Sequence, residues 1–148
     1  MGDYYPPSIG AMPTGSKLWI LNLGYLDCDE SNLLAGANSM SPSAPAQKHT
    51  RRHCVMICIL IYYPSVGLIL YDTGSPEDLI KHWDSADLEC TPRIWNKAEN
   101  GLPEAIAATG NKIQDVKLII ISHLHMDHCG GLEHFLGTGE YYFFFFDI

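Results

Sequence analysis

The chain has 148 residues, of which 47% are hydrophobic and 18% charged, the composition of a folded domain rather than of a disordered chain. Nine Lys and Arg against seventeen Asp and Glu give a formal net charge of −8. An acidic chain without a basic stripe disfavours binding to nucleic-acid phosphates, so no nucleic-acid partner is expected.

The N-terminal segment, the apolar runs and the cysteines indicate the cellular compartment of the protein. The segment "MGDYYPPSIG" lacks the charged and apolar regions of a signal peptide, and residues 1–15 are expected to be extended or disordered. The longest apolar run, Val55–Tyr63, is far shorter than the ~20 residues that span a bilayer. Five cysteines without a dense spacing indicate reduced thiols. We therefore expect a cytoplasmic protein with no membrane partner.

Strand signals come first along the chain. Ser16–Cys28 reads as a strand that ends near Gly24, and segment 29–52, rich in Ser, Ala and Pro, reads as a long polar loop. Two apolar runs around "PSVG" predict an antiparallel hairpin of Cys54–Tyr63 and Leu68–Tyr71. Both runs are apolar at odd and even positions, which predicts strands covered on two sides.

Helix signals and one more strand follow. A short helix is predicted over 76–83, with a serine as N-cap before it and a proline in its first turn. "LPEAIAATG" predicts another short helix that stops at Gly110. Val116–Ser122 is predicted as a third buried strand, and a short helix is expected over about 130–136.

A cluster of potential metal ligands directly follows this third strand: His123, His125, Asp127 and His128. Alternate side chains of an extended segment point the same way, so His123 and His125 project together, and Leu124 and Met126 face apolar packing. Imidazole and carboxylate groups bind zinc and related divalent ions. Two neighbouring ions fit residues this close better than one ion does, and two-metal sites are a hydrolytic device.

The other candidate side chains receive ordinary structural interpretations. Cys54 and Cys58 are weak evidence for a metal or redox role, and Cys129 is expected to be a buried thiol. Asp72 can cap a turn through its carboxylate. The remaining histidines are expected to be solvent-facing or packed: His49, His53, His82 and His134.

Two stretches together resemble a known family. "SHLHMDHCGG" is similar to the signature of the metallo-β-lactamase superfamily, and "LILYDTGSPEDL" resembles the segment that precedes this signature. Taken together, the two sequence stretches are most similar to the N-acyl-homoserine lactonase group, while glyoxalase II-like thioesterases share nearly the same motif. The resemblance covers 18–136. It implies an α/β (α+β) fold, the metallo-β-lactamase αββα sandwich, truncated to its N-terminal βα half.

The resemblance also implies roles for the cluster. His123 and His125 should bind a first zinc ion, and Asp127 and His128 a second, although iron or manganese would suit the same ligands. A metal-activated water would open a lactone or a related ester or thioester. Asp127 should also handle protons as the catalytic residue, and Asp72 should support the loop by hydrogen bonding.

The family's downstream half supplies further ligands that this chain does not show. The resemblance implies one more histidine for each ion and an aspartate that bridges both, and His134 lies too close to the motif to replace any of them. We therefore expect a partial domain over 16–136, with self-association through the exposed face of the half-sandwich. The alternative is a non-catalytic fragment that binds metal weakly or pairs with another chain.

The last segment, 137–148, has an unusual composition. Its sequence "GTGEYYFFFFDI" contains six consecutive aromatic residues, which favour a final strand. A second hypothesis is an intron read as protein, because Gly-Glu-Tyr can be encoded by a sequence that contains the splice donor GTGAGT.

Overall fold

The described residues are arranged around one mixed sheet. The computed structural model describes residues 12–43, 45, 49–137 and 142–145, the last four by their backbone alone. The strands are β1 (Lys17–Asp29), β2 (Arg51–Tyr63), β3 (Gly67–Tyr71), β4 (Arg93–Ile94), β5 (Val116–Ile121) and β6 (Tyr142–Phe145). Their order in the sheet is β4-β1-β2-β3-β5-β6. The pairs up to β3 are antiparallel, whereas β5 runs parallel to both β3 and β6.

Strand β1 is longer than the sequence predicts. It does not end near Gly24 but continues to Asp29, because the register against β2 shifts between Asn22 and Tyr25. Such a bulge absorbs an extra residue without ending the strand. Gly24 has a φ of +99°, and a Cβ there would lie 2.8 Å from the carbonyl oxygen of Ile94. The glycine therefore lets β4 approach β1.

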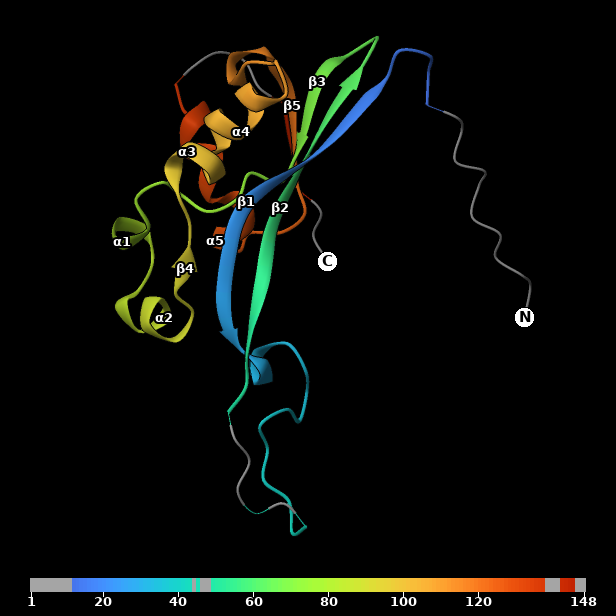
Figure 1. The fold of residues 1–148 in the computed structure, drawn as a ribbon. Helices are drawn as coiled ribbons and strands as arrows, with labels where there is room; N and C mark the ends of the chain where they lie inside the picture. The colour runs from blue at the N-terminus through green and yellow to red at the C-terminus, as the bar shows by residue number, and fades with distance from the viewer. Residues whose placement is uncertain (1–11, 44, 46–48, 138–141, 146–148) are drawn as a thin grey trace, which may run out of the picture.

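The predicted loop over 29–52 is shorter than expected at both ends. It begins with the 3-10 helix η1 (Glu30–Asn32), and Arg51 and Arg52 already belong to β2. The Arg51 guanidinium donates to the carboxylate of Asp27 across the ladder at 3.0 Å, which extends the pairing of two strongly polar segments. Figure 1 shows the resulting hairpin of β1 and β2 reaching well below the rest of the molecule.

The predicted hairpin of β2 and β3 is confirmed, but only one of its faces is covered. Cys58 and Leu60 are fully buried, whereas the intervening side of β2 leaves Val55 49% and Ile57 46% exposed. The prediction of cover on two sides is therefore wrong for β2, because no described element packs against this second side.

A helical layer covers the other face of the sheet (Figure 1). Its elements are α1 (Leu79–His82), α2 (Ser85–Cys90), α3 (Lys97–Asn100), α4 (Leu102–Ala108) and the 3-10 helix η2 (Ile113–Asp115). Helix α4 is the predicted helix that stops at Gly110, whose φ is +83°. Its fully buried Ile106 joins Leu60 and Ile119 in the core between helices and sheet.

The helix predicted over 76–83 forms only in its second half. Helix α1 begins at Leu79, with the Asp78 side chain as its N-cap. The Arg93 guanidinium donates to the carbonyl oxygens of Pro76 at 2.5 Å and Glu77 at 3.0 Å. Because these carbonyls are occupied from outside, the segment before Asp78 stays non-helical.

The predicted strand after the helical layer is confirmed as β5. It leads into α5 (Met126–Cys129) and the 3-10 helix η3 (Gly130–Phe135), which matches the helix expected over about 130–136. Of the aromatic tail, 142–145 forms β6 beside β5, while 138–141 and 146–148 lie outside the described residues, as does 1–11 of the N-terminal segment. No helix in the described part is long and apolar enough to cross a bilayer.

Candidate functional site

The predicted ligands come together where β5 ends. The ring centroids of His123 and His125 are 4.6 Å apart, and those of His123 and His128 are 4.0 Å apart. Asp127 lies beside them, with its Oδ2 3.3 Å from Nε2 of His128. The structure thus gathers all four residues of the HxHxDH pattern on one short segment.

The expectation that Leu124 and Met126 face apolar packing is wrong for Leu124. Leu124 is 68% exposed and does not face apolar packing. The extended segment ends at His125, which precedes the first turn of α5. Alternation of side chains therefore does not continue to Met126.

Asp72, which directly follows β3, fixes the start of the ligand-bearing segment by hydrogen bonds. Its buried carboxylate accepts hydrogen bonds from the Ser122 N–H at 2.8 Å and the Ser122 hydroxyl at 2.9 Å. Its Oδ2 also lies 2.8 Å from Nδ1 of His128. Burial raises the pKa of Asp72, but the hydrogen bonds from His128 and Ser122 outweigh burial and lower it overall. The carboxylate therefore stays charged and fixes one histidine of the cluster.

The residues after Asp72 pack closely against the glycine pair of the motif, Gly130 and Gly131. The N–H and hydroxyl of Thr73 both donate to the carbonyl oxygen of His128, at 2.7 and 2.9 Å. A Cβ on Gly131 would lie 2.3 Å from the Thr73 carbonyl oxygen, and one on Gly130 would lie 2.2 Å from Cδ of Pro76. Neither glycine has a positive φ. The pair is thus needed for close packing and not for unusual dihedrals.

Two carboxylates set the charge of His128. Hydrogen bonds to Asp127 and then to Asp72 raise the pKa of His128 to about 9. Burial raises the pKa of Asp127, but its hydrogen bond with His128 outweighs burial and lowers it overall. At neutral pH the arrangement is therefore an imidazolium between two carboxylates, a strong charge-assisted network.

The donor types suit zinc, but the donor count does not. Among the described residues, no group of three or more His, Cys, Asp or Glu side chains is placed to hold a metal ion. Both ring nitrogens of His128 face carboxylates instead. Zinc sites need at least three protein ligands, so the described part of the chain does not fit a metal ion on its own.

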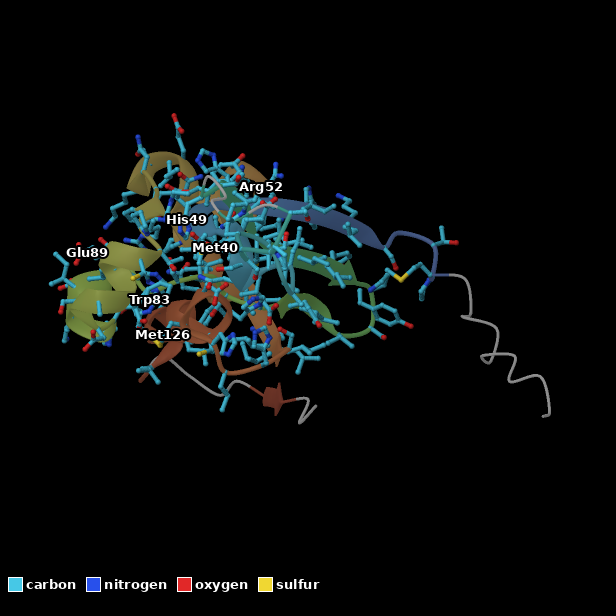
Figure 2. The ribbon with its side chains drawn as sticks, turned by 90° about the horizontal axis from the view of Figure 1, so that it is seen from below. Met40, His49, Arg52, Trp83, Glu89 and Met126 are labelled. Carbon is cyan, nitrogen blue, oxygen red and sulfur yellow. The ribbon has the colours of Figure 1, made fainter. Side chains whose placement is uncertain are left out.

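A cavity of about 330 Å³ lies beside the cluster. His125 and Asp127 form part of its wall, and an apolar part comes from Trp83, Leu124 and Met126. Figure 2 shows Trp83 and Met126 near each other on the same side of the molecule. A larger hollow of about 450 Å³ lies between β1 and α4, away from the cluster. Of these two cavities, it is the smaller one that lies at the predicted site residues.

Sequence reasoning missed several residues that build this site. Trp83, whose aromatic ring lines the cavity, follows α1 in a stretch with no motif, and Arg93 lies further along the same stretch. Ser122 was seen only as the end of a strand, although its hydroxyl lies 3.0 Å from Nδ1 of His123. A serine directly before the first histidine of the pattern was the one available signal. The histidines interpreted as structural lie outside the cluster: His49, His53, His82 and His134.

The chain belongs to the metallo-beta-lactamase superfamily, whose family model matches residues 58–141. This confirms the predicted family, and the mixed sheet with helices confirms the predicted fold. Among curated relatives, the N-acyl homoserine lactonases AiiB of Agrobacterium fabrum and of Rhizobium rhizogenes are each 28% identical over 124 residues. Those matches cover 82% of this chain and 44% of each relative. The chain thus spans less than half the length of these relatives.

Solved structures of lactonases are also similar to this chain over less than half of their length. A point mutant of AiiA from B. thuringiensis, with N-decanoyl-L-homoserine bound at its active site, is 25% identical with a TM-score of 0.63, over 82% of this chain and 46% of that one. A quorum-quenching N-acyl homoserine lactone hydrolase is 27% identical with a TM-score of 0.58, over 82% and 43%. The predicted likeness to the lactonase group is therefore confirmed.

Proposed function

We propose that this chain carries part of the site of a lactone hydrolase that uses zinc. The observation that carries the proposal is the gathering of the HxHxDH residues with Asp72 beside a partly apolar cavity. The likeness to N-acyl homoserine lactonases supports a lactone with an acyl chain as substrate, ahead of other esters and thioesters.

The residues around the cavity suggest separate roles in substrate binding and in proton transfer. Trp83, Leu124 and Met126 offer an apolar wall for an acyl chain. Asp127, whose lowered pKa keeps it deprotonated, would accept a proton from the attacking water and return it to the alkoxide that leaves. Water adds to the carbonyl carbon, the ring C–O bond breaks, and a hydroxy acid results.

The proposed zinc ions need more ligands than the described residues provide. His123 and His125 would give two donors to one ion, and Asp127 and His128 two to another, so both ions require donors from outside the described residues. A bound zinc would supply Lewis acidity and a water of lowered pKa. The proposed partners are thus a small substrate and, through self-association, a further polypeptide.

The proposed location is the cytoplasm. All five cysteines are free thiols, and burial raises the pKa of Cys58 and Cys129. Unpaired and partly buried thiols support a reducing compartment. Fractionation of the source cells, with detection of the chain by antibody, tests this location.

Zinc titration and hydrolysis together test the function. The purified chain is titrated with zinc against a chromophoric chelator, and release of acid from an N-acyl homoserine lactone and from an acyl thioester is followed. The chain alone is expected to bind zinc weakly, because it offers two donors to each ion. His123→Ala is expected to weaken this binding by at least about tenfold, whereas the control His134→Ala leaves it unchanged. Equal zinc affinity in His123→Ala would reject the ligand assignment. Zinc binding without lactone hydrolysis would favour the fragment alternative, and faster thioester cleavage a thioesterase.

A further inference from the structure

Two cysteines from neighbouring strands lie on the same side of the sheet. The register pairs Cys28 of β1 with Arg52, so Cys54, two residues further along β2, is the diagonal neighbour of Cys28. Cys28 is 7% exposed and belongs to the hydrophobic core, and Cys54 packs against that core on the same side of β2 as Leu60. Both thiols therefore lie on the side of the sheet that the helical layer of this chain covers.

The two thiols interact with each other. Burial, and next to it a hydrogen bond with the Cys54 thiol, raise the pKa of Cys28 to about 11. The Cys28 thiol also lies 3.8 Å from the carbonyl oxygen of Leu26, to which it donates. Cys28 therefore stays protonated in the core at neutral pH, and the partly exposed Cys54 is the thiol of the pair that a dissolved oxidant reaches first.

The other cysteines are less suitable partners for Cys54. Cys58 shares its side of β2 but lies four residues along an extended strand, ~13 Å away at ~3.3 Å per residue, about twice the span of a disulfide. The Cys129 thiol donates to the carbonyl oxygen of Leu124 at 3.4 Å, within its own segment. Cys90 is exposed at the end of α2. Cys28 and Cys54 are thus the pair best placed for a bond.

We propose that Cys28 and Cys54 form a redox-sensitive pair, which a hydroperoxide oxidises to a disulfide that links β1 to β2. Hydrogen peroxide converts the Cys54 thiol to a sulfenic acid, while its O–O bond breaks and one water forms. The Cys28 sulfur then attacks the Cys54 sulfur, an S–S bond forms, the S–O bond breaks, and hydroxide leaves with the Cys28 proton as a second water. The two thiols together lose two protons and two electrons.

A disulfide at this position would be reversible. Diagonal neighbours of an antiparallel ladder are about 7–8 Å apart, whereas the Cα atoms of a disulfide are usually within about 6.8 Å. Closing the bond therefore requires the two strands to approach by roughly 1 Å. Because this approach opposes the ladder, the bond is easily reduced by glutathione, as expected of a redox-sensing pair in a reducing compartment.

The pair lies between the far end of the hairpin and the candidate site. Arg51 and Arg52 follow the loop and lead into Cys54, and α5, which carries Asp127, packs against β2. The charge of Asp127 acts on the Cys28 thiol, so the two lie close together. Figure 1 shows β1 and β2 continuing together past α5. A disulfide here would restrict the opening of the hairpin beside the ligand segment, and it does not require the proposed hydrolase activity.

Thiol counting and peptide mapping test the pair. The purified chain is treated with hydrogen peroxide, its free thiols are titrated after denaturation, and the linked peptides are identified by mass spectrometry. We expect the wild type to lose two of its five thiols, to yield a peptide that joins Cys28 to Cys54, and to recover both thiols with glutathione. Cys54→Ser and Cys28→Ala should each remove that peptide, whereas the matched control Cys90→Ser retains it. Circular dichroism checks that each variant is folded.

Hydrogen exchange tests the effect on the hairpin. Amides of Arg52 and His53 are expected to exchange at least about tenfold more slowly in the oxidised chain than in the reduced chain, while amides of β3 do not change. The same treatment of Cys54→Ser should leave the exchange of the hairpin unaltered. This comparison separates the cross-link from oxidation elsewhere in the chain.

Other outcomes would overturn the proposal. Five free thiols after treatment, or a linked peptide that contains Cys90 or Cys129 in place of this pair, would show that Cys28 and Cys54 do not react with each other. Sulfinic acid at Cys54 without a disulfide would show that Cys28 does not reach it. A disulfide that forms without slowing exchange at the far end of the hairpin would reject the structural effect.

Discussion

Asp72 combines an uncommon backbone conformation with the densest hydrogen bonding of the candidate site. Its φ is +60°, in the left-handed region that aspartate and asparagine tolerate better than most residues. This conformation turns the chain out of β3, while the carboxylate reaches back to Ser122 and His128. One side chain therefore links the ends of two parallel strands.

The pH dependence of stability follows from this link. The pKa of His128 is raised from 6.5 to about 9, so in the metal-free chain its contribution to stability is complete below about 6.5 and is lost as the pH rises through about 9. Asp72→Asn keeps the shape and the backbone conformation but removes one charged partner. We expect the pKa of His128 to fall toward 6.5 and the free energy of unfolding at neutral pH to drop by about 1–3 kcal/mol.

Urea unfolding with chelator at several pH values, and an NMR titration of His128, measure both effects. Asp115→Asn is the control, since Asp115 is exposed and remote from the cluster. A His128 pKa that stays near 9 in Asp72→Asn would show that Asp127 alone controls the histidine.

At the scale of elements, the turn after β3 and the start of η3 are in direct contact. The N–H of Gly131 donates to the carbonyl oxygen of Gly74 at 3.0 Å, next to the contact with Thr73. Gly131→Ala would force a Cβ into that backbone, so we expect about 1–3 kcal/mol of destabilisation or more. Chemical unfolding measures it. Gly36→Asn is the control, because a Cβ at Gly36 meets nothing within 4 Å, and equal losses in both variants would contradict close packing at Gly131.

Arg93 ties the helical layer to the same turn. Its guanidinium donates to the Ser75 hydroxyl at 2.7 Å as well as to two carbonyls, and it stacks on Trp95 with 4.3 Å between Cζ and the ring centroid. Arg93→Met keeps much of the side-chain length but removes every donor. We expect faster hydrogen exchange at the Thr73 and Gly131 amides, because the segment that supports them loosens.

Exchange followed by NMR tests this role against Arg52→Met. The exposed Arg52 pairs with the half-buried Glu30 at the distant end of the hairpin, and ion pairs near the surface contribute little. Unchanged exchange at the turn in Arg93→Met would show that the glycine contacts alone hold it.

At the scale of the whole molecule, prediction from sequence succeeded where the signal was local. The runs that form β2, β3 and β5 are apolar enough to identify strands, and the HxHxDH spacing identifies a ligand cluster without knowledge of the fold. Strand β4 was missed because a distant contact, its pairing with β1, sets it. Helices α2 and α3 were missed because they have only six and four residues, too few for a periodic pattern, although Asp84 and Asn96 cap them. The cavity was missed because Trp83 reaches it from a separate segment.

The arrangement of the elements predicts where the molecule opens first. Leu70 and Ile119 are fully buried between the sheet and the helices, whereas Arg51, Arg52 and His53 lie exposed at the far end of the hairpin. Local opening requires little free energy where few apolar contacts are lost. Hydrogen exchange read by mass spectrometry is therefore expected to be roughly a hundredfold or more faster at the far end of the hairpin than in β3 and β5. Uniform exchange along β2 would instead show that the hairpin unfolds only together with the core.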